Sequence, residues 1–365
     1  MREAAPDPAF APQVIAWQRT HGRHALPWQN TRDPYRVWLS EIMLQQTQVA
    51  TVLGYYERFL QRFADVAALA AAPLDEVLAL WSGLGYYSRA RNMHRCAQAV
   101  MELHGGHFPA SSAGLMQLPG IGRSTAAAIA AFCFGERVAI LDGNVKRVLT
   151  RVLGFGGDLA ESAQERALWA LATELLPATD IETYTQGVMD LGATVCTTRS
   201  PACLLCPVVN QCVAARTNTQ AGYPVKTRKL KRGTREHVWL WLRWRGHVWL
   251  VRRPDTGVWA SLWSLPEFDS TAALDKAASG WPGAFEALPS FTHLLTHLDW
   301  TLHPLRWTLP ERTGAARVAA LVKPWPTGRW FDVDQVLAAG LPAPLRKLLL
   351  NAGDVSHARR APGGG

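Results

Sequence analysis

The segment LPGIGRSTAAAIAAF, residues 118–132, decides how the first half of the chain is interpreted. Gly120 and Gly122 have no Cβ atom, so a tight turn there can bring main-chain N–H groups against a ligand. The small residues that follow predict a helix, which begins at Ser124 and whose positive N-terminal end favours a phosphate. The segment is therefore either a backbone clamp for phosphate or a plain connector between helices.

Length and composition limit the classes of protein that fit. The 365 residues are 48% hydrophobic and 18% charged, which suits about two domains with full cores. A net charge of +9 is typical of a protein that approaches a polyanion, although a merely basic protein has the same balance. The N-terminus, MREAAPDPAFAPQ, has no apolar secretory core, and the longest uncharged apolar run, residues 124–135, is too short to span a bilayer. We therefore expect a cytoplasmic protein with no membrane partner.

Four of the six cysteines are close together in the sequence, with the spacing Cys196-x6-Cys203-x2-Cys206-x5-Cys212. Four thiolates within so short a segment indicate a metal centre, either tetrahedral zinc or an iron–sulfur cluster. Spacing alone does not choose between the two.

The character of the sequence changes near residue 220. Before it, apolar residues recur at three- and four-residue spacing and predict helices, for example over 73–80, 164–176 and 181–191. After it, short runs rich in β-branched and aromatic residues, such as VWLWLRW and VWLVRR, predict strands, and eleven of the sixteen tryptophans lie beyond Glu236. We expect a helical domain over 8–222, a basic linker over 223–235, a mixed α/β domain over 236–350 and a disordered tail over 351–365.

Two acidic residues are candidate catalytic groups. Glu41 lies in VWLSEIMLQQT, residues 37–47, where a helix would hold its carboxyl close to the apolar side. Desolvation would raise its pKa and suit it to act as a general acid, although a glutamate at the solvent edge of an amphipathic helix fits the same pattern. Asp142, in ILDGNVKRVLT, precedes a helical pattern and is expected to cap that helix, which leaves one oxygen for a site.

Five motifs, in this order, resemble the adenine-specific branch of the endonuclease III superfamily of helix-hairpin-helix DNA glycosylases. They are PWQNTRDPYRVWLSEIMLQQTQVATV (27–52), LWSGLGYYSRARN (80–92), LPGIGRSTAAAI (118–129), ILDGNVKRVL (140–149) and the cysteine group 196–212. The resemblance extends from about Trp17 to Cys212, and the C-terminal part resembles the Nudix-like domain of the same branch more loosely. It implies an α+β multidomain protein: an all-α domain with the helix-hairpin-helix at about 110–135 and a cluster loop at 196–212, followed by an α/β Nudix-like domain.

The resemblance also implies a substrate, a cofactor and catalytic roles. The substrate is duplex DNA in which adenine is mispaired with 8-oxoguanine or G, the protein is a monomer, and the four cysteines hold a [4Fe-4S] cluster. Glu41 would protonate adenine N7 and later activate water, while Asp142, with Asn144 beside it, would stabilise the sugar cation or bond to it transiently. Two carboxyl groups in unlike environments suit such an oxocarbenium-like reaction on chemical grounds alone.

The adenine must leave the base stack to be reached, so other side chains have to receive it and fill the gap. Residues that match the adenine pocket of the family are Trp28, Gln29, Leu44 and Gln186. Residues that match its DNA contacts are Gln46, Thr47, Leu84, Tyr86, Gly120, Gly122, Ser124 and Lys146, of which Gln46, Leu84 and Tyr86 are the wedge and stacking positions.

Ser124 separates two enzymatic interpretations. In the lyase branch of the superfamily a lysine stands at this point of the hairpin, and its amine attacks C1′ and leads to strand cleavage. A serine cannot form that imine, so the sequence favours a monofunctional glycosylase over a bifunctional glycosylase and lyase. Lys146 could nevertheless reach the abasic sugar and form an adventitious imine. A third hypothesis, a non-catalytic iron–sulfur DNA-binding protein, is disfavoured because both carboxylates stand in their motifs.

The C-terminal domain is expected to recognise 8-oxoguanine and not to hydrolyse nucleotides. Nudix hydrolases need a glutamate-rich helix to hold Mg²⁺, whereas residues 270–280 contain a single acid, Asp275. The recognition loop that the family writes FSH aligns with Leu295, Thr296 and His297. Leu295 lacks the aromatic ring, Thr296 keeps the hydroxyl, and His297 could also be an ordinary strand histidine.

Overall fold

The computed structural model describes residues 7–227, 231–333 and 335–351. The predicted disordered tail lies outside the described residues except for Asn351, and the predicted linker is described except for 228–230. The chain forms two compact units, one drawn from residues 1–56, 63–70 and 95–229 and the other from 57–62, 71–94 and 230–365. In the described part, no helix is long and apolar enough to cross a membrane.

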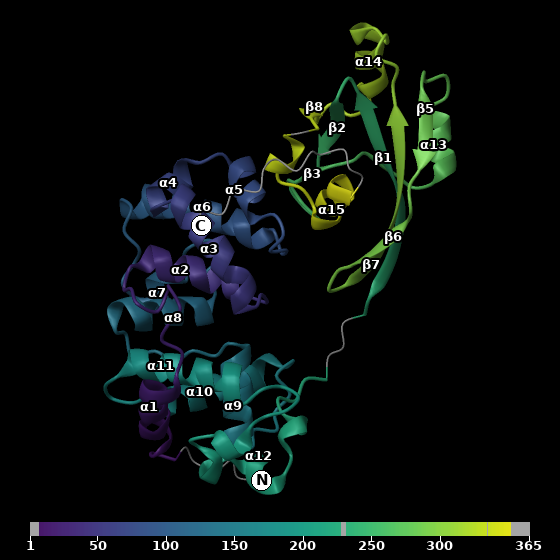
Figure 1. The fold of residues 1–365 in the computed structure, drawn as a ribbon. Coiled ribbons are helices and arrows are strands. Elements are labelled where there is room, and N and C mark those ends of the chain that lie inside the picture. The colour runs from purple at the N-terminus through teal and green to yellow at the C-terminus, as the bar shows by residue number, and fades with distance from the viewer. Residues whose placement is uncertain (1–6, 228–230, 334, 352–365) are drawn as a thin grey trace, which may run out of the picture. The chain divides into compact units, whose positions relative to one another are not determined.

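The first unit is all-helical (Figure 1). Its helices are α1 (Phe10–His21), α2 (Pro34–Leu44), α7 (Ser112–Leu115), α8 (Arg123–Phe134), α9 (Gly143–Leu153), α10 (Ser162–Glu174), α11 (Ile181–Asp190) and α12 (Val213–Thr217). Most of α4 (Val66–Ala71) also belongs to it, and α3 (Val49–Arg62) and α6 (Ser88–His104) contribute residues to both units. One turn of π-helix, Leu191–Val195, continues α11 toward Cys196. The helices predicted from periodicity at 164–176 and 181–191 are confirmed as α10 and α11.

Helix α8 lies at the centre of this unit because its residues are small. Residues 125–131 are all buried, and the helix contacts α2, α7 and α11. Alanine side chains allow neighbouring backbones to come close from several directions. Gly192 allows a second close approach, since a Cβ there would lie 2.7 Å from Asn144 Cβ at the start of α9. Both contacts hold the elements that line the pocket described below.

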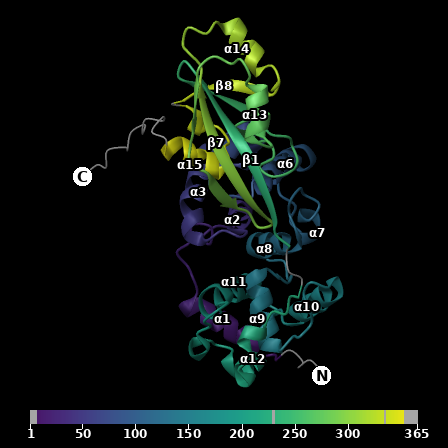
Figure 2. The same cartoon turned by 90° about the vertical axis from the view of Figure 1, so that its right-hand side faces the viewer.

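The second unit is built on a mixed eight-stranded sheet. Its strands are β1 (Gly233–Trp244), β2 (His247–Arg252), β3 (Trp263–Ser264), β4 (Glu267–Phe268), β5 (Ala284–Ala287), β6 (Phe291–Leu294), β7 (Leu298–Thr308) and β8 (Gly328–Asp332). The main order is β3-β2-β1-β7-β5, and β4, β6 and β8 pair with β1, β7 and β2. Among the strand pairs of the described residues, only β1 and β7 run parallel, side by side along their length in Figures 1 and 2. The two strands predicted from VWLWLRW and VWLVRR are confirmed as β1 and β2, which pair in antiparallel register at Trp244 and His247.

Tryptophans form much of the core of the second unit. The rings of Trp259 and Trp300 stack with centroids 4.7 Å apart, and Trp239 packs 5.9 Å from Trp259. The helices of this unit are α5 (Leu74–Trp81), α13 (Thr271–Ala277), α14 (Ala315–Val322) and α15 (Ala343–Asn351). Residues 71–94 pack in the same unit through polar contacts as well: Tyr87 Oη donates to Leu341 O at 2.8 Å.

Candidate active site

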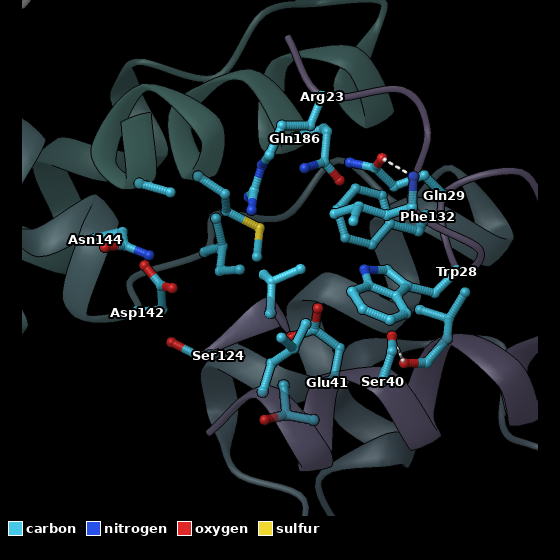
Figure 3. Close-up of a pocket in the computed structure, with 18 of the residues that line it drawn as sticks. Arg23, Trp28, Gln29, Ser40, Glu41, Ser124, Phe132, Asp142, Asn144 and Gln186 are labelled. Carbon is cyan, nitrogen blue, oxygen red and sulfur yellow. Dashed lines mark hydrogen bonds between the residues drawn. The ribbon is translucent and has the colours of Figure 1, made fainter. Parts of the chain in front are cut away.

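A pocket of about 1030 Å³ opens in the first unit and is lined by residues from α1, α2, α8, α9 and α11 (Figure 3). It brings together most of the site residues predicted for this unit. Those that line it are Trp28, Gln29, Glu41, Leu44, Gln46, Thr47, Ser124, Asp142, Asn144 and Gln186. Residues far apart in the sequence therefore face one space, with Asp142 and Asn144 on one side and Trp28 and Gln29 on the other.

Glu41 has the ionisation behaviour of a general acid. It lies on α2, half-buried at the pocket wall, next to the buried Ser40 and Ile42. Burial raises the pKa of its carboxyl to about 8, and the negative charge of Asp142 acts in the same direction. A carboxyl with this pKa keeps its proton at neutral pH, so it can donate one to a leaving group. The expected effect of desolvation is therefore present.

Asp142 both caps α9 and faces the pocket. Its Oδ1 accepts a hydrogen bond of 2.7 Å from the Val145 N–H, which is the N-cap contact expected from the sequence. Burial raises the pKa of this carboxyl, while the N–H groups of Val145 and Asn144 and the charge of Arg147 act to lower it. The net effect is a raised pKa, with these donors opposing the desolvation.

Ser124 is tied to the segment that carries Asp142. Its Oγ accepts a hydrogen bond of 3.3 Å from the N–H of Leu141, the residue before Asp142. The serine therefore has a role in positioning, and no amine stands at this point. In the hairpin before it, Gly120 has φ +77°, a left-handed conformation that favours glycine. Gly122 is exposed, and a Cβ there would meet open space, so its N–H can be approached from outside.

The candidate base-binding residues form the other side of the pocket. Trp28 is buried and packs edge-to-face against Tyr56 with ring centroids 5.2 Å apart, which fixes its indole plane. Gln29 and Gln186 lie near each other at this end, with Arg23 beside Gln186 (Figure 3). A flat aromatic wall with amide groups at its edge suits a purine.

The predicted wedge residues differ in exposure. Gln46 and Tyr86 are exposed and both have a positive φ, +56° and +47°, which is uncommon for residues with a Cβ. Leu84 is buried, at 6% exposure, so its side chain is not presented as those of Gln46 and Tyr86 are. Lys146 does not line the pocket, because its Nζ pairs with the Glu165 carboxylate.

The candidate 8-oxoguanine residues form the tip of a hairpin in the second unit. Leu295 N donates to Leu298 O at 2.8 Å, which closes a tight turn between β6 and β7 with Thr296 and His297 at its centre. Both central residues are exposed, and Thr296 Oγ1 lies 3.0 Å from Tyr86 Oη. Two residues predicted separately, one for DNA contact and one for recognition, thus meet within this unit.

Comparisons with known proteins place this architecture in a family. Residues 39–174 match the family described as HhH-GPD superfamily base excision DNA repair protein, and residues 237–351 match the NUDIX domain family. An adenine DNA glycosylase of Buchnera aphidicola from Schizaphis graminum is 34% identical, covering 93% of this chain and 97% of its own length. A human adenine DNA glycosylase is 31% identical, covering 95% of this chain and 74% of its own length. The chain belongs to the adenine DNA glycosylase family. It is a glycosylase enzyme.

Solved structures agree with the fold of this family member. A thermostable thymine-DNA glycosylase is 28% identical with a TM-score of 0.52, covering 57% of this chain and 96% of its own. Endonuclease III in a non-covalent DNA complex is 22% identical with a TM-score of 0.50, and this likeness concerns the fold alone. The predicted fold class, a helix-hairpin-helix glycosylase domain followed by an α/β Nudix-like domain, is confirmed.

In this family member the four clustered cysteines line one cavity, together with Arg151 and Gln220. Arg151 is buried, and its Nη1 lies 3.3 Å from Cys196 Sγ while it also donates to Thr197 O at 2.7 Å. Burial raises the pKa of the Cys206 thiol to about 11, so a thiolate there needs a nearby cation. Within the described ranges, no three His, Cys, Asp or Glu residues are grouped around the position of one metal ion. The four cysteines therefore share one cavity beside a buried arginine, but in the described part of the chain their side chains are not gathered at one metal position.

Three residues of the pocket region escaped the sequence interpretation. Arg23 and Arg147 line the pocket. Asp190 is fully buried and accepts hydrogen bonds from the pocket residues Arg23 and Gln186. Asp190 follows Gln186 by four residues on α11, a spacing that indicates neighbours on one helix face and could have been used. Nothing in the sequence indicates Arg23, because its contact with Asp190 joins segments 167 residues apart.

Proposed function

We propose that this enzyme flips adenine out of duplex DNA and excises it where it is mispaired with 8-oxoguanine or G, acting as a monofunctional, monomeric glycosylase in base excision repair. The observation that carries the proposal is the pairing of Glu41, whose pKa is raised to about 8, with Asp142 across one pocket that also presents Trp28 and Gln186. The relatives named adenine DNA glycosylase support the choice of base. The proposal places the enzyme in the cytoplasm, with the chromosome as its substrate.

The mechanism divides the work between the two carboxyl groups. The flipped base enters between Trp28 and Gln186, and Glu41 donates its proton to adenine N7, which makes the base a better leaving group. As the N-glycosidic bond breaks, positive charge develops on the sugar, and the Asp142 carboxylate stabilises it or bonds to C1′. Glu41, now ionised, takes a proton from the attacking water. The wedge and stacking roles implied by the family resemblance for Gln46, Leu84 and Tyr86 remain part of this proposal.

The geometry around Ser124 supports a reaction that ends at the abasic site. The serine hydroxyl accepts from Leu141 N–H and has no amine with which to form an imine. Lys146, which the sequence offers as a candidate for an adventitious imine, is paired with Glu165. A bifunctional glycosylase and lyase would need a free amine at the pocket, so this alternative is less well supported.

Discrimination of the oxidised guanine is assigned to the second unit. Thr296 supplies a hydroxyl at an exposed turn, His297 stands beside it, and Leu295 offers apolar contact without a ring. We take 8–222 as the glycosylase domain, 223–235 as the linker and 236–350 as the Nudix-like recognition domain. The second unit is not proposed to hydrolyse nucleotides, because Asp275 is the only acid in residues 270–280.

A [4Fe-4S] cluster is proposed as the resident cofactor, held by Cys196, Cys203, Cys206 and Cys212. When bound, it would cross-link the loop through four iron–thiolate bonds. Arg151 would offset the negative charge of the thiolates from within the protein. Purified protein is expected to be brown with about four irons per chain and little zinc, whereas stoichiometric zinc after anaerobic, iron-replete preparation would contradict the assignment.

The proposed function is tested by base release under single-turnover conditions. Duplexes that carry adenine opposite 8-oxoguanine, G or T are compared, and the strand is examined with and without heating in base. We expect adenine release opposite 8-oxoguanine and G, little opposite T, and strand breakage only after the treatment. Scission that keeps pace with base release in the untreated reaction would indicate the lyase, and duplex binding without base release would indicate the non-catalytic alternative.

A further inference from the structure

Two glutamine side chains lie at the base-binding end of the pocket, and in each a hydrogen bond to the protein occupies either the oxygen or the nitrogen of the amide. Gln29 Oε1 accepts a hydrogen bond of 3.3 Å from Leu26 N–H, shown as a dashed line in Figure 3. Its Nε2 is buried and has no hydrogen-bond partner among the residues that the structure describes. An unsatisfied buried donor costs stability unless something accepts from it, so this N–H₂ group indicates a ligand acceptor at the pocket.

Gln186 is fixed in the opposite sense. Its Nε2 donates to Asp190 Oδ1 at 2.8 Å, so its carbonyl oxygen is the end left for the pocket. Amide oxygen and nitrogen are distinguished only by their partners, and here the partner decides, because Asp190 Oδ1 also accepts from the Arg23 guanidinium and so acts as an acceptor.

Asp190 accepts hydrogen bonds at both of its carboxyl oxygens. It is fully buried, Arg23 Nε donates to its Oδ1 at 2.7 Å, and Arg23 N–H donates to its Oδ2 at 2.9 Å. A carboxyl group that accepts at both oxygens from a guanidinium and a main-chain N–H presents acceptors to its other neighbours. These contacts therefore hold the Gln186 amide with its nitrogen toward Asp190.

We propose that Asp190 is a positioning residue that sets base selectivity by locking Gln186 as an acceptor opposite the Gln29 donor. This inference rests on the proposed function. An adenine edge presents an amino donor at C6 next to a ring-nitrogen acceptor, which matches the pair. A 6-oxopurine such as hypoxanthine presents an oxygen at C6, which would face the Gln186 oxygen without a proton between them. The lock thus admits 6-aminopurines and rejects 6-oxopurines.

The test compares single-turnover release of adenine and of hypoxanthine, each opposite 8-oxoguanine. In Asp190→Asn the side chain can donate or accept, so Gln186 can present either end of its amide to the base. We expect the adenine-to-hypoxanthine rate ratio to fall by about tenfold or more, consistent with the value of one base-edge contact. A merely structural role for Asp190 would lower both rates together and leave the ratio unchanged.

A charge-conserving swap provides the rescue. In Asp190→Asn/Gln186→Glu the carboxylate moves to position 186, where it can only accept, and the amide introduced at position 190 supplies a donor to hold it. The ratio should return to within about threefold of that of the unaltered chain, because the acceptor is locked again. Gln186→Met, which leaves the Asp190–Arg23 pair intact, is the second variant. It should lose the discrimination as Asp190→Asn does, even if Asp190→Asn fails to fold.

The outcomes separate the inference from the function on which it rests. Failure of the unaltered chain to release adenine from any duplex would overturn the proposed function and this inference with it. Normal adenine release with an unchanged ratio in Asp190→Asn or in Gln186→Met would overturn the inference alone. Folding of each variant is checked by circular dichroism and by duplex binding.

Discussion

At Glu41 a carboxyl keeps its proton at a pH where most carboxyls have lost it, because burial and Asp142 both oppose its ionisation. Glu41→Gln and Asp142→Asn should therefore each lower the rate of base release by roughly a thousandfold or more, since each group acts mainly in the transition state. Duplex binding should persist. The measurement is single-turnover release with a parallel binding assay, and near-normal rates in either variant would remove that residue from the mechanism.

The raised pKa of Glu41 also predicts how activity depends on pH. If the protonated form is the acid, kcat/KM should fall as the pH rises through about 8, the pKa of this carboxyl in the free protein. Glu41→Asp offers a matched control, since it keeps a carboxyl with a shorter reach and should move the midpoint as well as the maximum. A profile that is flat from pH 6 to 9 would exclude Glu41 as the essential acid.

The same shift predicts a change in stability, whose sign follows from proton binding. The folded state holds the Glu41 proton up to about pH 8, whereas the unfolded chain loses it near the ordinary value of 4.5. The contribution of this group to stability is complete below pH 4.5 and is lost as the pH rises toward 8. Glu41→Gln should therefore raise the melting temperature relative to the parent at pH 8 and have little effect at pH 4. An equal change at both values would contradict the shift.

Lys146 forms an ion pair with Glu165, and this pair predicts a latent side reaction. Glu165→Gln should free the amine and increase the fraction of protein that borohydride traps on abasic DNA by several-fold. Lys146→Ala in the same background should abolish the increase. If trapping does not change in Glu165→Gln, the pair does not restrain the lysine.

Among the elements, α9 connects the pocket to the cysteine loop. Asp142 caps its N-terminus, Arg147 Nη2 donates to Asn144 Oδ1 at 2.8 Å and its Nε donates to Cys196 O at 2.7 Å. One turn later, Arg151 touches Cys196 Sγ. Two arginines on one helix thus contact the cysteine loop, and one of them, Arg147, also contacts Asn144 at the pocket.

These contacts predict different effects for two similar substitutions. Arg147→Met should lower base release by about tenfold or more with little loss of iron, because it loosens Asn144 beside Asp142. Arg151→Met should lower iron content and thermal stability first, because it leaves the thiolates without their buried cation. Iron analysis and base release on the same preparations distinguish the two. If iron content and the rate of base release fall together in each variant, the two arginines do not have separate roles.

The sequence predicted the elements better than it predicted their contacts. Three- and four-residue spacing indicated α10 and α11, and the aromatic runs indicated β1 and β2, because periodicity is a local property. The caps were also local, so Asp142 could be placed at the start of α9. The Asp190–Arg23 pair could not be found, since side-chain pairing across 167 residues depends on how the helices pack. For the same reason the spacing of the four cysteines carried no information about Arg151.

Considered as a whole molecule, the chain places residues 71–94 in the same compact unit as residues 230–365. Arg91 Nη1 donates to Ala260 O at 2.8 Å, and a Cβ on Gly340 would lie 2.9 Å from Leu78 Cβ. Periodicity indicated a helix near 73–80 but nothing about which residues it would pack against.

Truncation after residue 235 is therefore predicted to have two effects. The preference for adenine opposite 8-oxoguanine over adenine opposite G should fall by about ten- to a hundredfold, because Thr296 and His297 are lost. The melting temperature should also fall, because the truncation uncovers Leu78 and Tyr87. Thr296→Ala and His297→Ala in the full chain should reproduce part of the first effect without the second. If the truncated protein keeps its full preference for adenine opposite 8-oxoguanine, the glycosylase domain itself recognises the oxidised base.

The tryptophan-rich core of the second unit determines what an optical experiment on this protein can observe. Trp81 and the eleven tryptophans beyond Glu236 belong to that unit, so twelve of the sixteen indoles emit from it. The first unit holds four, Trp17, Trp28, Trp38 and Trp169, and of these Trp28 lines the pocket. Bulk fluorescence during heating or titration would therefore follow the second unit, and a base that stacks on Trp28 would quench one emitter against fifteen others. To follow base binding by fluorescence, a variant is required in which the emission of Trp28 dominates that of the other tryptophans.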